Sequence, residues 1–253
     1  ARITSNRIDY EALTSLGAPM PSALQDLLTW VRTPRLLDTL CAVGLAQGTV
    51  PRVCRALGGD LPMLYATGVL TVSENPHRAV PLLPVFKVPK QDGLSSRLIV
   101  DCRALNDLLP RPGDMGLPRV DQVVDLILRH RWAAEADAVS YFYQFGLEGG
   151  ADKAFRVAYG QQRGQFVVAT INVLPMGFSY APVIAQHVSN FLVAIAVDAH
   201  RAQGGRATAV VWVDNFIVVG DCRREVVALC SVLADIFAQV RLELKAPFST
   251  PSQ

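Results

Sequence analysis

The feature that most restricts the fold of this chain is the segment VVWVDNFIVVG, residues 210–220, an apolar run with Asp214 and Asn215 at its centre. Runs rich in β-branched and aromatic residues are typical of strands. A carboxylate buried there without a partner is costly, and it would normally take up a proton. The run therefore predicts two short strands that turn at Asp214-Asn215, with a balancing charge close to Asp214.

A second acid, Asp137, lies in the strand-like stretch AAEADAVSYFYQFGL. Two carboxylates brought together stay ionised when a cation lies between them, and Mg²⁺ prefers a few carboxylates with open positions for phosphates. Two bridged ions can stabilise the attacking and leaving oxygens of a phosphoryl transfer. The alternative is that each acid caps a turn or pairs with an arginine. The residues alone leave both interpretations open.

Composition limits the class of protein. The chain has 253 residues, of which 51% are hydrophobic and 18% charged, as expected for one large or two small globular domains. The net charge of +2 gives little support for a dedicated nucleic-acid binder. No apolar run reaches the roughly 18 residues of a membrane span, so no membrane partner is expected. Five scattered cysteines without a CxxC pair favour an intracellular, reducing compartment.

The pattern of apolar residues changes near residue 63. Residues 22–58 have helical apolar spacing that Pro34 interrupts, and a third short helix is expected over residues 50–57. We therefore expect residues 1–63 to form a helical N-terminal extension. A helix-turn-helix DNA reader is the alternative for this part. From residue 69 strand-like segments, among them residues 82–89 and 97–101, are mixed with helical ones, among them residues 117–130 and 224–240. This mixture predicts an α+β domain over residues 64–253. The sequence starts at Ala1 without an initiator Met, which indicates a removed leader or part of a longer chain.

Motif blocks in residues 64–248 resemble the fingers and palm of a reverse transcriptase, of the long-terminal-repeat retroelement type, with signs of degeneration. Each block alone is weak, but they follow one another in the family's order and spacing. The blocks are VPKQDGLSSRLIVDCRALND, GLPRVDQVVDLILRHRWAAEADAVSYFYQF, DKAF before a strand, NVLPMGFSYAPVIAQ, and VVWVDNFIVVG at the family's aromatic-x-Asp-Asp turn.

This resemblance implies a right-hand polymerase fold: fingers and an antiparallel palm sheet backed by helices, a helical N-terminal extension and no thumb. It implies a catalytic group of Asp137, Asp214 and Asn215. Asp137, the carbonyl of Ala138 and Asp214 would hold Mg²⁺ or Mn²⁺ for deoxynucleotidyl transfer. Asn215 stands where the family has a second Asp, so the site has one negative charge fewer.

The resemblance also implies nucleotide-binding residues. Lys90 and Arg97 match the finger residues that hold a triphosphate, and Phe142 matches the aromatic steric gate against a 2′-hydroxyl. Met176 and Gly177 match the loop beside the nucleotide, where glycine lets backbone approach a ligand. Without the resemblance, Lys90 and Arg97 would be solvated turn residues and Phe142 a core aromatic.

Template binding is implied for Asp101, Arg103 and Asn106, although Asp101 and Arg103 could equally form a structural ion pair. Tyr141 departs from the family's small residue and could crowd the nucleotide site. These departures favour a catalytically impaired domain kept as a scaffold or RNA-contacting subunit of a larger ribonucleoprotein assembly. The alternatives are an active RNA-directed DNA polymerase fragment and a single-stranded nucleic-acid binder without chemistry. We expect nucleic acid and other proteins as partners.

Overall fold

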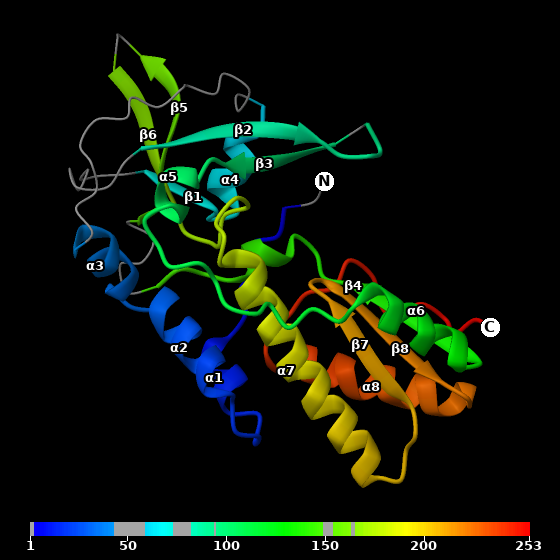
Figure 1. Cartoon of the computed structure of the whole chain (residues 1–253). Helices are drawn as coiled ribbons and strands as arrows, with labels where there is room; N and C mark the ends of the chain where they lie inside the picture. The colour runs from blue at the N-terminus through cyan, green and yellow to red at the C-terminus, as the bar shows by residue number, and fades with distance from the viewer. Residues whose placement is uncertain (1–2, 43–58, 73–81, 94, 149–153, 163–164) are drawn as a thin grey trace. The chain divides into compact units, whose positions relative to one another are not determined.

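The computed structural model describes residues 3–42, 59–72, 82–93, 95–148, 154–162 and 165–253. Along these residues helices α1 to α4 come first, and strands and helices are mixed after them, as Figure 1 shows. The helices are α1 (Tyr10–Thr14), α2 (Ser22–Val31), α3 (Arg35–Ala42), α4 (Leu61–Ala66), α5 (Arg103–Asn106), α6 (Val120–Arg129), the 3-10 helix η2 (Tyr141–Gln144), α7 (Ala181–Ala202) and α8 (Arg223–Gln239). The strands are β1 (Leu70–Val72), β2 (Leu83–Pro89), β3 (Ser96–Val100), β4 (Trp132–Asp137), β5 (Arg156–Gln162), β6 (Gln165–Ile171), β7 (Thr208–Trp212) and β8 (Asn215–Gly220).

The chain forms two compact units. Unit 1 comprises Ala1–Ser5, Gln25–Pro112 and Phe142–Ala181, and unit 2 comprises Asn6–Leu24, Gly113–Tyr141 and Pro182–Gln253. This division does not follow the expected boundary at residue 63, because part of the N-terminal region belongs to each unit. Within unit 2, the backbone N–H of Asp9 donates to the carbonyl of Val240 at 2.8 Å, which ties the segment before α1 to the end of α8. A folding boundary at residue 63 stays a prediction.

Unit 2 contains a three-stranded antiparallel sheet in the order β4-β8-β7. Side chains alternate between its faces. One face is buried and packs on α8, where the rings of Phe216 and Phe237 lie 4.7 Å apart. Strand pairing places Asp137, Asn215 and Trp212 in one row on the other face. The sheet therefore has a core side and a more open side, and the acid at the end of β4 is on the open one.

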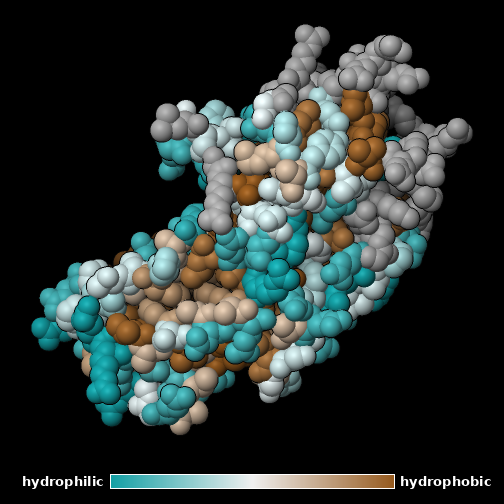
Figure 2. All heavy atoms as spheres, turned by 180° about the vertical axis from the view of Figure 1, so that it is seen from behind, coloured by the Kyte–Doolittle hydropathy of each residue, from teal (hydrophilic) through white to brown (hydrophobic). Residues whose placement is uncertain are grey.

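The helix expected over residues 117–130 forms, but its apolar side chains are not core residues. No side chain of α6 is buried, and Val120, Val124 and Leu128 are 63%, 48% and 78% exposed. These residues recur every four positions, so they share one face of the helix. Figure 2 shows one face of the molecule, on which hydrophobic patches interrupt a largely hydrophilic surface. Helical periodicity here predicts the element correctly without predicting burial.

Unit 1 is built around a five-stranded sheet in the order β1-β6-β5-β2-β3. All neighbours are antiparallel except β2 and β5, which pair in parallel. Its core is aromatic: Phe155 and Phe178 meet edge to face with ring centroids 5.0 Å apart, and Trp30 contacts Tyr180 in the same geometry at 4.7 Å. Such pairs add about 0.5–1.5 kcal/mol each beyond their buried area.

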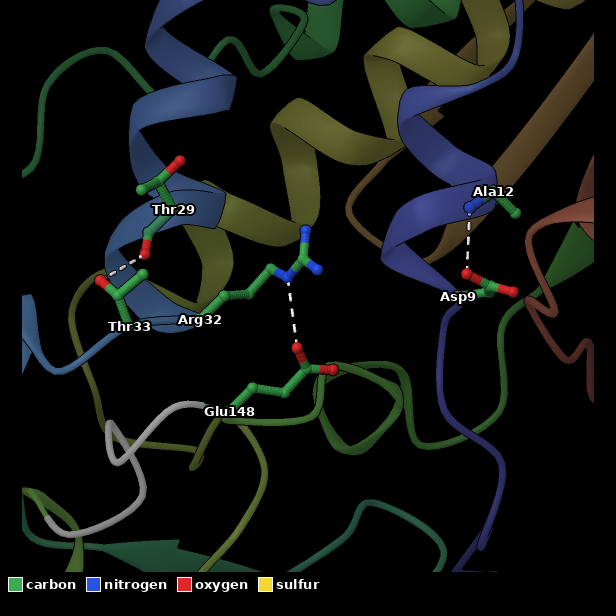
Figure 3. A network of polar contacts seen from close by, with 6 residues as sticks. All are labelled: Asp9, Ala12, Thr29, Arg32, Thr33 and Glu148. Carbon is green, nitrogen blue, oxygen red and sulfur yellow. Dashed lines mark hydrogen bonds and ion pairs between the residues drawn. The ribbon is translucent and has the colours of Figure 1, made fainter.

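The break expected at Pro34 is confirmed, because α2 ends at Val31 and α3 begins at Arg35. Proline lacks the N–H that a continuous helix would need, and its carbonyl instead accepts the N–H of Asp38 at 2.9 Å. Figure 3 shows the polar contact that follows α2, where Nε of Arg32 lies 3.3 Å from Oε2 of Glu148. The third helix expected in this region, over residues 50–57, lies outside the described residues.

Helix α7 has 22 residues and, of the described helices, it alone is long and apolar enough to cross a membrane by length and composition. In its most apolar window 67% is buried inside the protein, as for a central core helix. No such segment was expected from the sequence, because polar residues interrupt the apolar run of this helix. The polar residues Gln186 and Ser189 lie within this helix, and both are fully buried. They are central to the candidate site.

Candidate active site

The turn between β7 and β8 carries the candidate catalytic acid. It consists of Val213 and Asp214, and Trp212 pairs with Asn215 where the hairpin closes. The turn therefore lies one residue earlier than expected, and Asn215 is the first residue of β8. Val213 has a φ of 55°, which a β-branched residue rarely adopts. Two-residue hairpin turns need this positive φ at their first position.

Two buried side chains of α7 hold this strained turn. The N–H of Val213 donates to Oε1 of Gln186 at 2.6 Å, and the amide of Gln186 donates to the carbonyl of Val211 at 3.0 Å. The hydroxyl of Ser189 donates to the carbonyl of Val213 at 2.6 Å. Backbone strain persists only where the surroundings determine the conformation. Gln186 and Ser189 provide that support, because Gln186 accepts the N–H of Val213 and Ser189 donates to the carbonyl of Val213.

Strand pairing brings the two expected acids close together within unit 2. Asp137, the last residue of β4, pairs directly with Asn215. The N–H of the next residue, Ala138, donates to the carbonyl of Asp214 at 2.8 Å. Directly paired residues have Cβ atoms about 4.5–5.5 Å apart. The four residues expected to form the metal and catalytic group, including Ala138, are therefore adjacent, with the amide of Asn215 and not Asp214 opposite Asp137.

The carboxylate of Asp137 already has a cationic partner. Nζ of Lys245 lies 3.2 Å from its Oδ2, and the side chains of Lys245 and Asp137 are 53% and 44% exposed. An exposed pair of this kind contributes only about 0–1 kcal/mol to stability. Its consequence is electrostatic: an ammonium group stands where the resemblance implies a metal ion. The alternative expectation was an arginine partner; Asp137 is instead paired with a lysine.

The residues present do not fit a two-metal site. Among the described residues no group of three or more His, Cys, Asp or Glu side chains is placed to hold a metal ion. Mg²⁺ favours anionic oxygen ligands, but one of the two acids is paired with Lys245, and Asn215 supplies an uncharged amide. The Oδ1 atom of Asn215 is buried and has no hydrogen-bond partner in the described part of the chain. No catalytic step through a metal follows from this arrangement.

Tyr141, where the family has a small residue, lies in the core of unit 2. It is 4% exposed, and its hydroxyl is 2.9 Å from that of Ser189. Burial raises the pKa of the phenol strongly, the charge of Asp214 raises it further, and the hydrogen bond with Ser189 opposes both effects. The phenol therefore stays neutral and supports the side chain that holds Val213. The expectation that it crowds a nucleotide site stays a prediction.

The expected nucleotide- and template-binding residues belong to unit 1. Lys90 follows β2, and its N–H donates to the carbonyl of Ser95 at 2.8 Å across the hairpin turn to β3. Arg97 lies on β3, paired with Val88, and its side chain is exposed. In the described residues no carboxylate lies within 4.0 Å of either basic group. Phe142, in η2, is half-buried.

The loop of Met176 and Gly177 packs against β3. The carbonyl of Met176 accepts the N–H of Val100 at 2.8 Å. Gly177 has a φ of 119°, and a Cβ added there would lie 2.0 Å from the carbonyl oxygen of Val100. The close backbone approach expected at this glycine therefore exists, but it is made to the protein's own strand. Any approach to a nucleotide stays a prediction.

All three expected template residues have structural partners. The amide of Asn106 donates to the carbonyl of Gly177 and accepts the N–H of Ser179, both at 3.0 Å. Asp101 and Arg103 form a two-point ion pair, with Nε of Arg103 2.8 Å from Oδ1. The bond from Arg103 lowers the pKa of Asp101. The structural-pair alternative thus describes Asp101 and Arg103, while Asn106 holds the loop that contains Gly177.

Comparison with known proteins bears on the fold. No protein-family model matches the sequence, and no curated protein matches it significantly. Among solved structures, the fold is similar to the crystal structure of a prototype foamy virus protease-reverse transcriptase mutant, with a TM-score of 0.55 and 18% identity. The match covers 78% of this chain and 24% of that one, so this chain spans about a quarter of its length. The chain therefore has a distant reverse-transcriptase-like fold, with the mixed α and β architecture that the motif blocks predicted.

Proposed function

We propose that this chain is a reverse-transcriptase-like fingers–palm domain with impaired nucleotidyl transfer, kept as a scaffold or RNA-contacting subunit of a larger assembly. The observation that carries the proposal is the ion pair between Asp137 and Lys245. With Asn215 opposite Asp137, two carboxylates and one ammonium leave a single net negative charge at the site. Mg²⁺ is usually held by one or two carboxylates together with substrate phosphates, so a site with a single net negative charge is expected to hold two divalent ions weakly.

Contact with RNA is proposed for the hairpin of β2 and β3. Of its basic residues and those near it, Lys87 pairs with Asp60 and Arg103 pairs with Asp101. Lys90 and Arg97 have no such partner among the described residues, so their charges are available to phosphates. Lysine offers a point charge and arginine a forked donor, and both match phosphate oxygens. Because the chain carries a net charge of only +2, this local pair would supply much of the attraction.

The first test is primer extension. The full chain, given a primed RNA template, deoxynucleotides and Mg²⁺ or Mn²⁺, is expected to bind the template without extending the primer. The background is set by Asp137→Asn, which removes the first carboxylate. Extension by the wild-type chain well above that background would overturn the proposed impairment and support the alternative, an active RNA-directed DNA polymerase fragment.

The second test locates the RNA contact. Replacing both Lys90 and Arg97 by alanine is expected to weaken binding of a single-stranded RNA and to reduce the slope of log K against log [salt] by about 1.4, since each phosphate contact on a single strand contributes about 0.7. Fluorescence anisotropy across a salt series measures both quantities. Arg35→Ala with Arg111→Ala removes the same charge from exposed positions of the same unit. An equal loss in this control would show a general charge effect and no contact at the hairpin.

The partners and compartment are part of the same proposal. Cys102, Cys222 and Cys230, the cysteines whose side chains are described, are free thiols, which fits an intracellular, reducing compartment. A polymerase fold without chemistry would contribute its surfaces, so we expect it in a complex with RNA and other proteins. Isolation of the native protein with a defined set of proteins and RNA would support this placement.

A further inference from the structure

Lys245 is held beside Asp137 by the backbone and not only by its side chain. The N–H of Lys245 donates to the carbonyl of Asp137 at 2.8 Å, and Leu244 forms a β-bridge with Ala138. Further along, the N–H of Ser249 donates to the carbonyl of Glu135 at 2.9 Å. The segment after α8 thus follows the outer edge of β4. These backbone hydrogen bonds determine which residue lies next to Asp137, and that residue is Lys245.

The charges around this position favour a resident cation. The ammonium of Lys245 lies 3.2 Å from Oδ2 of Asp137. The residue paired with Asp137 across the strands is the uncharged Asn215, and the residue before it, Asp214, lies in the turn. Like charges repel a second cation brought to the same carboxylate, and this repulsion is doubled for a divalent ion. Because the backbone holds Lys245 next to Asp137, its ammonium group has a high effective concentration at that carboxylate, unlike a free ion in solution.

We infer that Lys245 is the built-in counter-cation of this site and takes the place of a divalent metal at Asp137. The inference rests on the proposed function, because it gives the physical reason why the acid pair persists without metal chemistry. It also extends that proposal, because the cation that offsets the charge of Asp137 comes from the segment after α8 and not from added metal. Removing the lysine should open the carboxylate to a metal ion.

The test is a Mn²⁺ titration of the full chain, with free Mn²⁺ followed by electron paramagnetic resonance. Lys245→Met keeps the length of the side chain and removes its charge, and it is expected to bind Mn²⁺ about tenfold more tightly than the wild-type chain. Lys245→Arg keeps the charge and should bind as weakly as the wild type. Combining Lys245→Met with Asp137→Asn should abolish the gain, since the carboxylate is then absent.

A thermal melt with and without Mn²⁺ gives a second readout on the same proteins. The metal should raise the melting temperature of Lys245→Met and leave those of the wild type and Lys245→Arg unchanged. Equal Mn²⁺ affinity of the wild type and Lys245→Met, or a gain that survives Asp137→Asn, would overturn the inference. Its failure is separate from failure of the proposed function: tight Mn²⁺ binding without primer extension overturns only the role of Lys245, and primer extension overturns the proposed function.

Discussion

Replacing Gly177 by alanine is expected to lower the free energy of unfolding of unit 1 by about 3–5 kcal/mol. Two costs combine. Its φ of 119° is strained for any residue with a Cβ, and the new Cβ would lie 2.0 Å from the carbonyl oxygen of Val100, a backbone atom that cannot rotate away. Urea denaturation measures the loss. Hydrogen exchange at the N–H of Val100, which donates to Met176, should show it locally.

Alanine substitutions at two other glycines measure the cost of the backbone conformation apart from the cost of the steric clash. Gly93 has a φ of 64° with nothing within 4 Å of an added Cβ, so Gly93→Ala should cost only about 1 kcal/mol from the backbone conformation. Gly113 has neither constraint, and Gly113→Ala should change stability by less than about 0.5 kcal/mol. If Gly177→Ala were no more harmful than Gly93→Ala, the close packing of the loop on β3 would be wrong.

This comparison bears on the expected role of the loop. A glycine that approaches its own strand is required for folding whether or not a nucleotide binds beside it. Asn106 forms hydrogen bonds with Gly177 and Ser179 of the same loop. Replacing Asn106 would therefore disturb the structure of the loop as well as any template contact that the resemblance implies. Loss of RNA binding on replacing Asn106 or Gly177 would therefore need a stability measurement before it could indicate a contact.

Much of the fold could be predicted because local patterns and tertiary packing agree. The strands at 82–89 and 97–101 and the helices at 117–130 and 224–240 form within a few residues of their predicted bounds. Periodicity shows which residues share a face but not what covers that face, which is why the exposed apolar stripe of α6 was not anticipated. The strand expected through residues 133–147 ends at Asp137, because η2 begins four residues later.

The sequence predicted which residues of the β7–β8 hairpin lie near Asp137, but it did not predict the exact position of the turn or the side chains that hold it. Placing the turn at Asp214-Asn215 followed ordinary turn preferences, which disfavour a β-branched residue at positive φ. Val213 adopts that conformation because Gln186 and Ser189, twenty-odd residues earlier on α7, bind its backbone. The glutamine of the APVIAQ block was in the motif, but only its buried polar position on an apolar helix could have indicated this role.

Lys245 was beyond prediction from local pattern. It lies 108 residues from Asp137 in the chain, and the pairing arises because the segment after α8 follows the edge of β4. A lysine near the end of a sequence gives no sign of its partner. The absence of the second family Asp at Asn215 was visible in the sequence, whereas the ammonium group beside Asp137 was not.

Restoring the missing charge by Asn215→Asp is expected to tighten Mn²⁺ or Mg²⁺ binding by about 30- to 100-fold, since one more anionic ligand charge close to a divalent ion is worth roughly 2–3 kcal/mol in a partly exposed site. Asn215 pairs directly with Asp137, so the new carboxylate would face the first one across the strands. Without metal this like-charge pair should lower the melting temperature, and added metal should restore it. Calorimetric titration measures the affinity, and thermal melts with and without metal measure the coupling.

The control for this change is an acid elsewhere on the same sheet. Thr208→Asp adds one carboxylate to the far end of β7, at a half-buried position paired with Val219 and away from the turn, and it should not create metal binding. Combining Asn215→Asp with Lys245→Met should bind metal more tightly than either change alone, because the added ligand and the removed ammonium act on one ion. Primer extension is expected to stay absent even then, since charge is only one of the requirements of transfer. No gain in metal affinity from Asn215→Asp would contradict the prediction that the missing charge limits metal binding at this hairpin. A gain accompanied by primer extension would show that the amide at Asn215 was by itself the cause of the impairment.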